Sequence, residues 1–444
     1  MKRLASRFLS TFLNIFKLII YVGGALVFFY LMGIDNFQVR NLSRTLVVMA
    51  VTYVMLTYFL AKIYGGYDIG VRKQRMIFLS LELSMLITDS VTYVMFLIMN
   101  TNDANNREFE ISSFGYFFLS LLIQTGLILV FTNLGAKLYD SVRPAERVLI
   151  ISSRASEEED ISKAVATRSR NFDVVDSCRY DAPDIRERIR GVNSVFFYDV
   201  PPGERSDLVN YCYKHLRNVY LSPDISDIVG MTAYQMMFGD VLFLAKKFNT
   251  MTFEQRFIKR IMDIGISALC LIITAPLSLI AAIAIKSGDG GSVLFKQKRA
   301  TINGRTFDIY KFRTMKENVE NRSASDNDER ITKAGRWLRK YRIDELPQLI
   351  NIIKGDMSLV GPRPEMLENV SEYEKELPEF KYRLRMKAGL TGLAQVMGRY
   401  NTSSRDKLIL DLIYIEDFSI MADIRILFRT VIVLFKAEDS TKGF

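Results

Sequence analysis

Five apolar runs limit the fold of this chain more than any other feature. Each is close to the ~20 residues that an α-helix needs to cross the hydrocarbon core of a bilayer. Four of them fill the first third of the sequence and the fifth comes later: Phe12–Met32, Thr45–Ile63, Met76–Met99, Phe114–Leu134 and Ile264–Ile285. With 444 residues, 49% of them hydrophobic, the chain has room for two or three folding units and is too apolar to be wholly soluble. We therefore expect four N-terminal transmembrane helices.

The charges around the first four runs predict their orientation. Basic residues precede the first run, fill the loop between the second and third, and follow the fourth, whereas the loop between the third and fourth is acidic. The positive-inside rule then places both ends in the cytoplasm. No small-residue cleavage site follows the first run, which indicates an anchor rather than a removed signal peptide. Lys17, Glu82 and Asp89 are expected to face the bundle interior or the interface, and their isolation disfavours a transport pathway.

Strand-like and helix-like segments alternate after Pro144. Strands are predicted at Arg147–Ser152, Phe172–Val175, Ser194–Tyr198 and Asn218–Leu221, and helices at Glu157–Arg168, Pro183–Arg190 and Arg205–Leu216. This alternation predicts a small Rossmann-like α/β domain with a parallel sheet. The turn after the first strand lacks every glycine that a dinucleotide fingerprint needs, so we expect a structural or regulatory role for this domain rather than cofactor binding.

The fifth apolar run differs from the other four. It has no charge, but basic residues flank it on both sides, which contradicts a crossing from inside to outside. Pro276 near its middle removes a helical N–H, and Thr274 and Ser278 are close enough to satisfy the freed backbone groups. A transmembrane helix remains the alternative on length alone. The pattern favours a re-entrant helix over residues 258–286 that enters and leaves one leaflet.

Basic and acidic residues gather in short motifs after this run. Phe307–Arg313 alternates like a strand and would present Lys311 and Arg313 on one face. Four cations precede the acidic pair Asp344 and Glu345, which comes just before a predicted helix over Gln348–Ile353. Asp344 could be an ordinary N-cap of that helix. The nearby cations instead favour a phosphate site at the helix start.

Two further motifs are rich in proline or glycine. In Gly361-Pro362-Arg363-Pro364, the prolines restrict the Arg363 backbone and so preorganise a guanidinium for an anion, although a rigid loop with a solvated arginine would have the same sequence. The segment 388–392 is glycine-rich and is followed by Gln395 and Arg399, which suit polar contacts or an ordinary loop. The last helix, predicted over Ile424–Lys436, carries a basic stripe that suits either a membrane surface or a core edge.

Net charge and cysteine content narrow the classes of function. A net charge of +10 fits nucleic acid, anionic lipid or phosphorylated substrates, and the position of the charge within these motifs favours phosphates. Cys178, Cys212 and Cys270 lack metal-ligand spacing, so neither a zinc site nor a disulfide framework is predicted. His215, in a basic helical stretch, is interpreted as a surface residue.

From about Lys259 to the C-terminus the chain resembles the bacterial sugar transferase family, the monotopic polyprenyl-phosphate hexose-1-phosphate transferases. The matching motifs follow the order of the family: Lys259-Arg260 with Asp263, the proline-broken helix, Phe295-x-Gln297-x-Arg299, Lys311-Phe312-Arg313-Thr314-Met315, Asp328-x-Arg330-Ile331-Thr332 with Gly335, Asp344-Glu345-Leu346-Pro347-Gln348, residues 355–364, and Gly389-Leu390-Thr391-Gly392 with Gln395 and Arg399. Upstream, the four spans and the α/β domain look like the large members that begin exopolysaccharide or O-antigen repeat units.

This resemblance implies transfer of a sugar 1-phosphate from a UDP-sugar to polyprenyl (undecaprenyl) phosphate, with release of UMP. It implies Asp344 as the nucleophile, Glu345 as the ligand of Mg²⁺, and substrate contacts from the remaining matched side chains: Arg363, Lys311, Arg313, Arg330, Gln395 and Arg399. Arg339, one of the cations before the acidic pair, is expected to join Arg363 on the phosphate oxygens. It also implies a multi-pass protein of the bacterial cytoplasmic membrane with its catalytic domain on the cytoplasmic side. Membrane lipid is then a partner, nucleic acid is not, and a homodimer is left open.

The expected architecture is a membrane α-helical bundle plus α/β domains. A transmembrane domain covers residues 1–142, a degenerate Rossmann-like domain 143–250, and a mixed, mainly helical catalytic domain 251–444. Two other functions fit parts of the chain. A membrane-tethered nucleotide-sugar dehydratase or epimerase would need a glycine fingerprint and a Tyr-x-x-x-Lys pair, and the only such spacing, Tyr58 to Lys62, lies in an apolar run. A scaffold that binds phosphorylated lipid would not need the acidic pair.

Overall fold

The computed structural model describes residues 2–64, 74–100, 111–142, 145–153, 161–163, 165, 171–248, 251–316, 328–397 and 403–434. The chain divides into two compact units, Met1–Ser222 and Pro223–Phe444. Packing thus groups residues 223–248 with the segment that follows them. The division into three domains at residues 142 and 250 stays a prediction.

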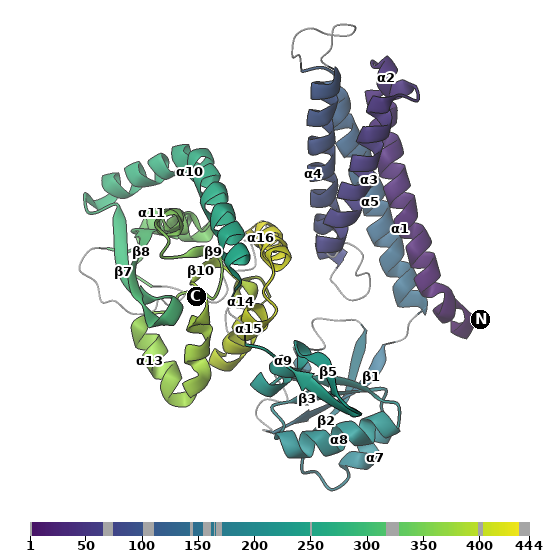
Figure 1. Cartoon of the computed structure of the whole chain (residues 1–444), viewed down its shortest axis with the longest axis vertical. Coiled ribbons are helices and arrows are strands. Elements are labelled where there is room, and N and C mark those ends of the chain that lie inside the picture. The colour runs from purple at the N-terminus through teal and green to yellow at the C-terminus, as the bar shows by residue number, and fades with distance from the viewer. Residues whose placement is uncertain are drawn as a thin grey trace. The chain divides into compact units, whose positions relative to one another are not determined.

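The first unit begins with a helical bundle (Figure 1), whose helices are α1 Lys2–Met32, α2 Phe37–Arg40, α3 Arg44–Tyr64, α4 Gln74–Asn100 and α5 Phe114–Val142. α1 packs on α5, α3 packs on α4, and α4 packs on α5. The four long helices coincide with the four predicted apolar runs. Arg44–Tyr64, Gln74–Met99 and Phe114–Tyr139 are long and apolar enough to cross a membrane, and Lys17–Met32 is a shorter apolar helix.

A buried carboxylate joins the helices of this bundle. Asp89 of α4 is fully buried, and its Oδ1 accepts hydrogen bonds from Tyr53 of α3 (2.9 Å) and from Gln124 of α5 (3.3 Å). Its Oδ2 accepts a hydrogen bond from Ser120 of α5 at 3.1 Å. Gln124 also donates to the carbonyl of Gly24 in α1. Asp89 therefore faces the bundle interior, as expected for an ionisable residue in an apolar helix.

The rest of the first unit is an α/β fold. Its strands are β1 Glu146–Ser152, β2 Phe172–Arg179, β3 Ser194–Tyr198 and β4 Asn218–Leu221, and its helices include α7 Ile185–Arg190 and α8 Pro202–Lys214. The sheet has the order β2-β1-β3-β4 and every pairing is parallel. This confirms the parallel sheet. The helix predicted over Glu157–Arg168 lies mostly outside the described residues.

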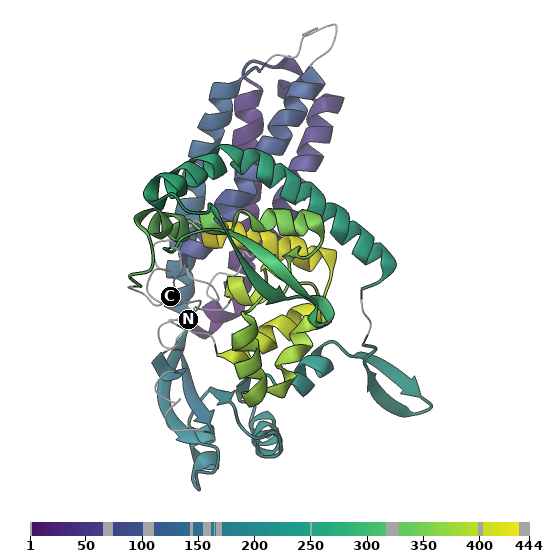
Figure 2. The ribbon, with the colours of Figure 1, turned by 90° about the vertical axis from the view of Figure 1, so that its left-hand side faces the viewer.

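The second unit, shown from the side in Figure 2, is mainly helical with three short β pairs. Its elements are α9 Ile225–Met231, β5 Tyr234–Phe238, β6 Val241–Ala245, α10 Phe253–Asp289, β7 Leu294–Ala300, η1 Ile302–Gly304, β8 Thr306–Phe312, α11 Lys333–Lys340, η2 Ile343–Glu345, α12 Gln348–Lys354, β9 Ser358–Val360, α13 Leu367–Glu376, η3 Pro378–Arg385, β10 Gly389–Thr391, α14 Leu393–Met397, α15 Ser404–Glu416 and α16 Ile420–Leu434.

The N-terminal half of α10 is fastened to the core of this unit by charged side chains. Lys259 Nζ lies 2.5 Å from Asp423 Oδ2 of α16 and donates to the carbonyl of Val360 in β9 at 3.1 Å. Asp263 accepts hydrogen bonds from Ser358 and from the amide of Leu359. Arg260 donates to the carbonyls of residues 352 and 353, at the C-terminal end of α12. The Lys-Arg and Asp motif is therefore a structural attachment of α10.

The C-terminal half of α10 packs on the same unit through apolar contacts. Ala281 and Ile285 form one buried cluster with Leu338 of α11 and Ile343 of η2. The helix continues through Pro276, and its ribbon bends in the middle (Figures 1 and 2). Other apolar side chains of α10 are exposed, including Ile272 at 73% and Leu279 at 63%. Phe253–Gly288 is also long and apolar enough to cross a membrane.

The last helix packs on the core as well. Asp423 and Ile426 of α16 are buried, whereas Arg425 is exposed. The buried residues of α16 therefore agree with the interpretation as a core helix with a basic edge. Contact of α16 with a membrane surface stays a prediction.

Replacing Lys259 by Ala would leave the buried carboxylate of Asp423 without its cation. We expect a loss of about 3–5 kcal/mol in the free energy of unfolding, because the remaining buried charge would be uncompensated. Thermal unfolding of the purified chain in detergent measures this. Arg305→Ala is the control, because Arg305 is 58% exposed in its pair with Asp356 and the loss of this pair should change stability by less than ~1 kcal/mol. Equal unfolding temperatures for the two variants would contradict this role of Lys259.

Candidate functional site

The acidic pair lies in a short, tightly turned segment between α11 and α12. Asp344 and Glu345 belong to the 3-10 turn η2, which follows Arg342 in the left-handed conformation with φ of 54°. α12 begins at Gln348, with Pro347 at its N-cap and no side-chain cap. The interpretation of Asp344 as an N-cap was therefore wrong, because the extra turn separates the carboxylate from the start of the helix. The phosphate site predicted at that helix start stays a prediction.

Cations from three separate segments surround the pair. Arg363 donates to Glu345 Oε1 at 2.8 Å, and Lys311 Nζ of β8 lies 3.7 Å from the same oxygen. Arg339 of α11 acts electrostatically on Asp344 and donates to the Thr314 hydroxyl at 2.9 Å. The fold thus brings together Lys311, Arg339 and Arg363, which the sequence predicted separately.

The Gly361-Pro362-Arg363-Pro364 segment is held by the glycine-rich segment that follows η3. β9 and β10 pair in parallel, the amide of Gly361 donates to the Thr391 carbonyl, and the amide of Gly389 donates to the Pro362 carbonyl, both at 2.9 Å. A Cβ on Gly361 would lie 2.3 Å from the carbonyl oxygen of Lys387, and one on Gly389 would lie 2.1 Å from the Gly361 nitrogen. Both positions therefore require glycine, and the second motif supports the Arg363 loop.

Burial and neighbouring charges shift the pKa values of Asp344 and Glu345 in opposite directions. Burial and the neighbouring Glu345 raise the pKa of Asp344 to about 6, although Lys311, Arg339 and Arg363 oppose the shift. Burial alone would also raise the pKa of Glu345, but Arg363 and Lys311 lower it to about 2. Burial lowers the pKa of the Lys311 ammonium, and Glu345 partly opposes that change. Such a separation of two adjacent carboxyl groups is typical of sites where they have different roles.

This difference favours Asp344 as the nucleophile. Glu345 is held as a carboxylate by direct contact with Arg363 and Lys311. Asp344 is the more basic of the two, so its lone pairs are more available for attack on an electrophile. Near pH 7 Asp344 is still largely ionised, because its pKa is about 6.

The other predicted site residues lie in different surroundings. Arg330 binds Asp328 two residues away, with Nε to Oδ1 at 2.8 Å. Arg313 is buried just beyond the end of β8. Gln395 lies against Gly392, where an added Cβ would come within 2.6 Å of its Oε1. Arg399 lies outside the described residues, and Pro276 lies inside α10. Their assigned roles stay predictions.

The site contains charged residues that were not predicted to belong to it. Arg299 at the end of β7 is 9% exposed, and burial lowers its pKa to about 10 in the neighbourhood of Glu365 and Arg363. Glu365 follows Pro364, two residues after Arg363, and Arg383 of η3 is 4% exposed. The Phe-x-Gln-x-Arg motif could have indicated Arg299. Nothing in the sequence around Arg383 distinguishes it from the exposed Arg385.

The acidic pair fits the usual coordination of Mg²⁺ in phosphate-transfer sites. Within the described part of the chain, no group of three or more His, Cys, Asp or Glu side chains could hold a metal alone. Mg²⁺ usually binds through one or two carboxylates and completes its shell with substrate phosphates and water. Asp344 and Glu345 can supply that number of carboxylates, and Arg363 already occupies one oxygen of Glu345.

Replacing Asp344 by Asn should stabilise the protein at neutral pH. A raised pKa in the folded state means that ionisation opposes folding above pH ~6, whereas below the unfolded value near 4 the carboxyl group is neutral in both states. We expect Asp344→Asn to gain about 1–3 kcal/mol at pH 7.5 and almost nothing at pH 3.5. Thermal unfolding at both pH values measures the difference. A larger gain at the lower pH would contradict the assigned direction.

The second unit of the chain is similar in sequence to known proteins. A profile of the family described as "Bacterial sugar transferase" matches residues 254–437. A UDP-glucose:undecaprenyl-phosphate glucose-1-phosphate transferase of Caulobacter vibrioides is 41% identical over 190 residues, which cover 41% of this chain and 71% of that relative. The exopolysaccharide production protein ExoY of Sinorhizobium fredii is 38% identical over 191 residues, which cover 39% of this chain and 83% of ExoY.

A UDP-N-acetylgalactosamine-undecaprenyl-phosphate N-acetylgalactosaminephosphotransferase of Aeromonas hydrophila is 42% identical over 181 residues, 39% of this chain and 43% of that relative. The chain thus matches less than half the length of this longer relative. The match to the two shorter proteins covers more than two thirds of each and confirms the resemblance seen in the sequence motifs. The chain belongs to the bacterial sugar transferase family.

Proposed function

We propose that this protein transfers a sugar 1-phosphate from a UDP-sugar to undecaprenyl phosphate and so begins the assembly of a polysaccharide repeat unit. The observation that carries the proposal is a buried acidic pair with opposed pKa shifts, placed among Lys311, Arg339 and Arg363. Relatives matched over more than a third of this chain are named as transferases of this kind. Proteins that only bind phosphorylated lipid would not need a basic carboxylate beside a fully ionised one.

The reaction proceeds in two displacements at one phosphorus atom. Asp344 attacks the phosphorus that bears the sugar, forming an Asp–O–P bond while the bond to the UMP oxygen breaks and UMP leaves. A phosphate oxygen of undecaprenyl phosphate then attacks the same phosphorus, and the Asp344 carboxylate is released. The product is a diphosphate-linked sugar on the lipid, and the covalent aspartyl intermediate divides one difficult substitution into two.

Neutralising the substrate charge is the main electrostatic requirement of the first displacement. A carboxylate approaching an anionic diphosphate is repelled, so cations must offset the charge that develops on the phosphate oxygens. Arg363 and Arg339 supply fixed guanidinium groups, and Lys311 supplies an ammonium next to Glu345. Mg²⁺ held by Glu345 and the donor phosphates would add further positive charge there.

The contacts of α10 support a position of the site at the membrane. Both halves of this helix pack on the same unit, the first through Lys259 and Asp263 and the second through Ala281 and Ile285. A helix whose two halves pack on one unit cannot end on the opposite side of the bilayer. We therefore propose that α10 enters one leaflet and returns to the same side. Ile343 joins the cluster around Ala281, and Asp344 is the next residue. This arrangement keeps the acidic pair close to the membrane surface, on the cytoplasmic side where UDP-sugars are found.

Replacing Asp344 by Asn or Ala should abolish transfer. Asn retains the shape of the side chain but cannot form the acyl phosphate, so we expect activity to fall at least ~10³-fold and no phosphosugar to be captured on the protein. UMP release and intact-protein mass spectrometry measure the two effects. Asp181→Asn is a matched control, because Asp181 lies in the α/β fold of the first unit and its ion pair with Arg179 is exposed. Normal turnover of Asp344→Asn would remove this residue from its proposed role.

A panel of UDP-sugars separates this function from the two alternatives. The chain in lipid nanodiscs is supplied with Mg²⁺ and each donor, with and without undecaprenyl phosphate. Only a transferase makes steady-state UMP release depend on the lipid, whereas a dehydratase or epimerase converts the sugar and a scaffold converts nothing. The same panel identifies the sugar, which a few pocket contacts could set.

The rate of the first displacement should depend on the ionisation of Asp344. With a pKa of about 6, the reactive carboxylate disappears as pH falls, so we expect the rate to decrease about tenfold per pH unit below pH ~5. Arg339→Gln removes a charge that lowers this pKa and should shift the acid limb to higher pH. Single-turnover UMP release between pH 4.5 and 8.5 measures both profiles. A limb that stays in place in Arg339→Gln would contradict the assignment to Asp344.

A further inference from the structure

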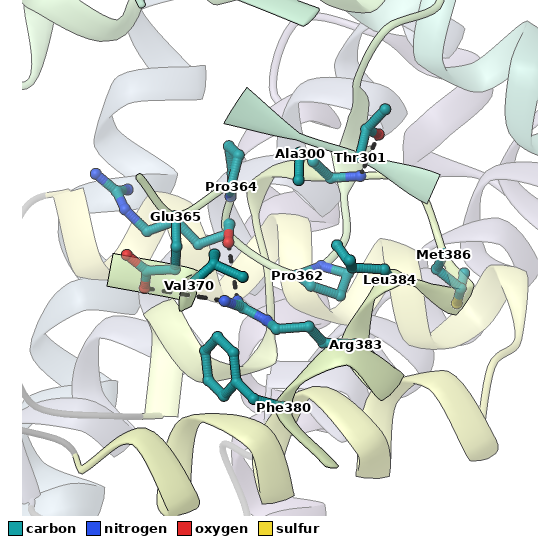
Figure 3. Close-up of a pocket in the computed structure, with 12 residues that line it drawn as sticks. Ala300, Thr301, Pro362, Pro364, Glu365, Val370, Phe380, Arg383, Leu384 and Met386 are labelled. Carbon is teal, nitrogen blue, oxygen red and sulfur yellow. Dashed lines mark hydrogen bonds and ion pairs between the residues drawn. The ribbon is translucent and has the colours of Figure 1, made fainter. Parts of the chain in front are cut away.

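Arg383 donates a hydrogen bond to the backbone carbonyl of Arg363, the proline-flanked arginine. Its side chain lies over the Phe380 ring and points toward Glu365 at the wall of a small cavity (Figure 3). One NH2 hydrogen is donated to the carbonyl oxygen of Arg363 at 2.8 Å, and NH1 lies 4.0 Å from Glu365 Oε1. Only 4% of the Arg383 surface is exposed, so the guanidinium is enclosed by the protein.

Asp411 of α15 fixes the Arg383 guanidinium from the opposite direction. Asp411 Oδ2 accepts a hydrogen bond from Arg383 Nε at 2.9 Å and forms an ion pair with NH2 at 2.7 Å, and the carboxylate is 1% exposed. α15 also brings Lys407 to within 3.5 Å of Glu365. On its other side α15 packs on α9, where Ile228 shares a buried cluster with Leu408. The guanidinium is therefore held in one place and one plane.

One backbone torsion angle of the Arg363 segment is not fixed by the flanking prolines. The flanking prolines fix their own φ and restrict the residue before each of them, yet within the extended region the ψ of Arg363 still sets the direction of its carbonyl. Pro364 has no N–H with which to anchor that peptide. The hydrogen bond from Arg383 to the Arg363 carbonyl supplies the missing restraint.

We propose that Arg383, held by Asp411, is a positioning residue that orients Arg363 toward Glu345 and the donor phosphates. The proposal rests on the function assigned above only where it mentions the donor. A planar guanidinium has several N–H donors in fixed directions and can bind a carboxylate and a carbonyl at once. A lysine ammonium is a point charge without this fixed donor geometry. Arg383→Lys therefore keeps the buried charge but loses the simultaneous contacts.

The first test is structural and does not depend on activity. Cryo-electron microscopy of the full chain in nanodiscs would compare the unchanged protein with Arg383→Lys and with Asp411→Asn. We expect the Arg363 guanidinium to leave hydrogen-bonding distance of Glu345 in both variants. Arg385→Lys is the matched control, because Arg385 lies in the same η3 segment, is 48% exposed and binds Glu416. An Arg363 to Glu345 contact that persists in both variants overturns the proposal.

The second test separates positioning from a general structural role. We expect Arg383→Lys to lower kcat about 10- to 100-fold, with a smaller change in KM for the UDP-sugar, because misplaced groups affect the transition state most. In an Arg363→Ala background the same change should cost less than about threefold, since coupled residues are not additive. Equal losses in both backgrounds overturn the proposal. If Arg383→Lys does not fold, Asp411→Asn decides by the same comparison.

Loss of the proposed function and loss of the Arg383 role give different experimental results. An unchanged chain that releases no UMP contradicts the proposed function, and the structural comparison still decides the role of Arg383. An active chain in which the effects of Arg383→Lys and Arg363→Ala are simply additive leaves the function in place and removes Arg383 from it.

Discussion

The attachment of both halves of α10 to one core is the constraint on which the rest of the second unit depends. Lys259 and Asp263 fasten the first half to β9 and α16, and Ala281 and Ile285 fasten the second half to α11 and η2. A straight helix of 37 residues would be roughly 55 Å long and could not return to the same core. The bend in the helix therefore follows from its contacts, and the interior proline makes that bend less costly.

The same packing creates the electrostatics of the acidic pair. Ile343 is buried against α10, so the next two residues lie in a partly desolvated place. Burial alone would raise the pKa of both carboxyl groups, and direct contact with Arg363 and Lys311 reverses the shift for Glu345 only. Two chemically similar neighbours thus acquire different basicity because one of them is closer to the cations. The glycine-based pairing of β9 with β10 supports the loop that carries Arg363.

Particular residues show which features of the structure could be predicted from local sequence. The strands at Ser194–Tyr198 and Asn218–Leu221 were predicted at their observed limits, because each is a short run containing β-branched and aromatic residues between turn residues. Asp344 as an N-cap was wrong, because the left-handed Arg342 inserts a 3-10 turn that no propensity indicates. The Lys259, Arg260 and Asp263 motif belonged to the family pattern, but only the fold shows that these residues attach a helix. Arg383 resembles Arg385 in sequence, and burial alone distinguishes them.

The sequence by itself determined the apolar helices, the parallel sheet and the residue types of the site, because periodicity, proline and glycine act over a few neighbouring positions. It also determined the family, through motifs spread over about 180 residues. Only the tertiary structure decided which cations reach the acidic pair and which carboxyl group is the more basic. Those properties depend on distances and burial between segments far apart in the chain, and electrostatic interactions in a partly buried site change steeply with both.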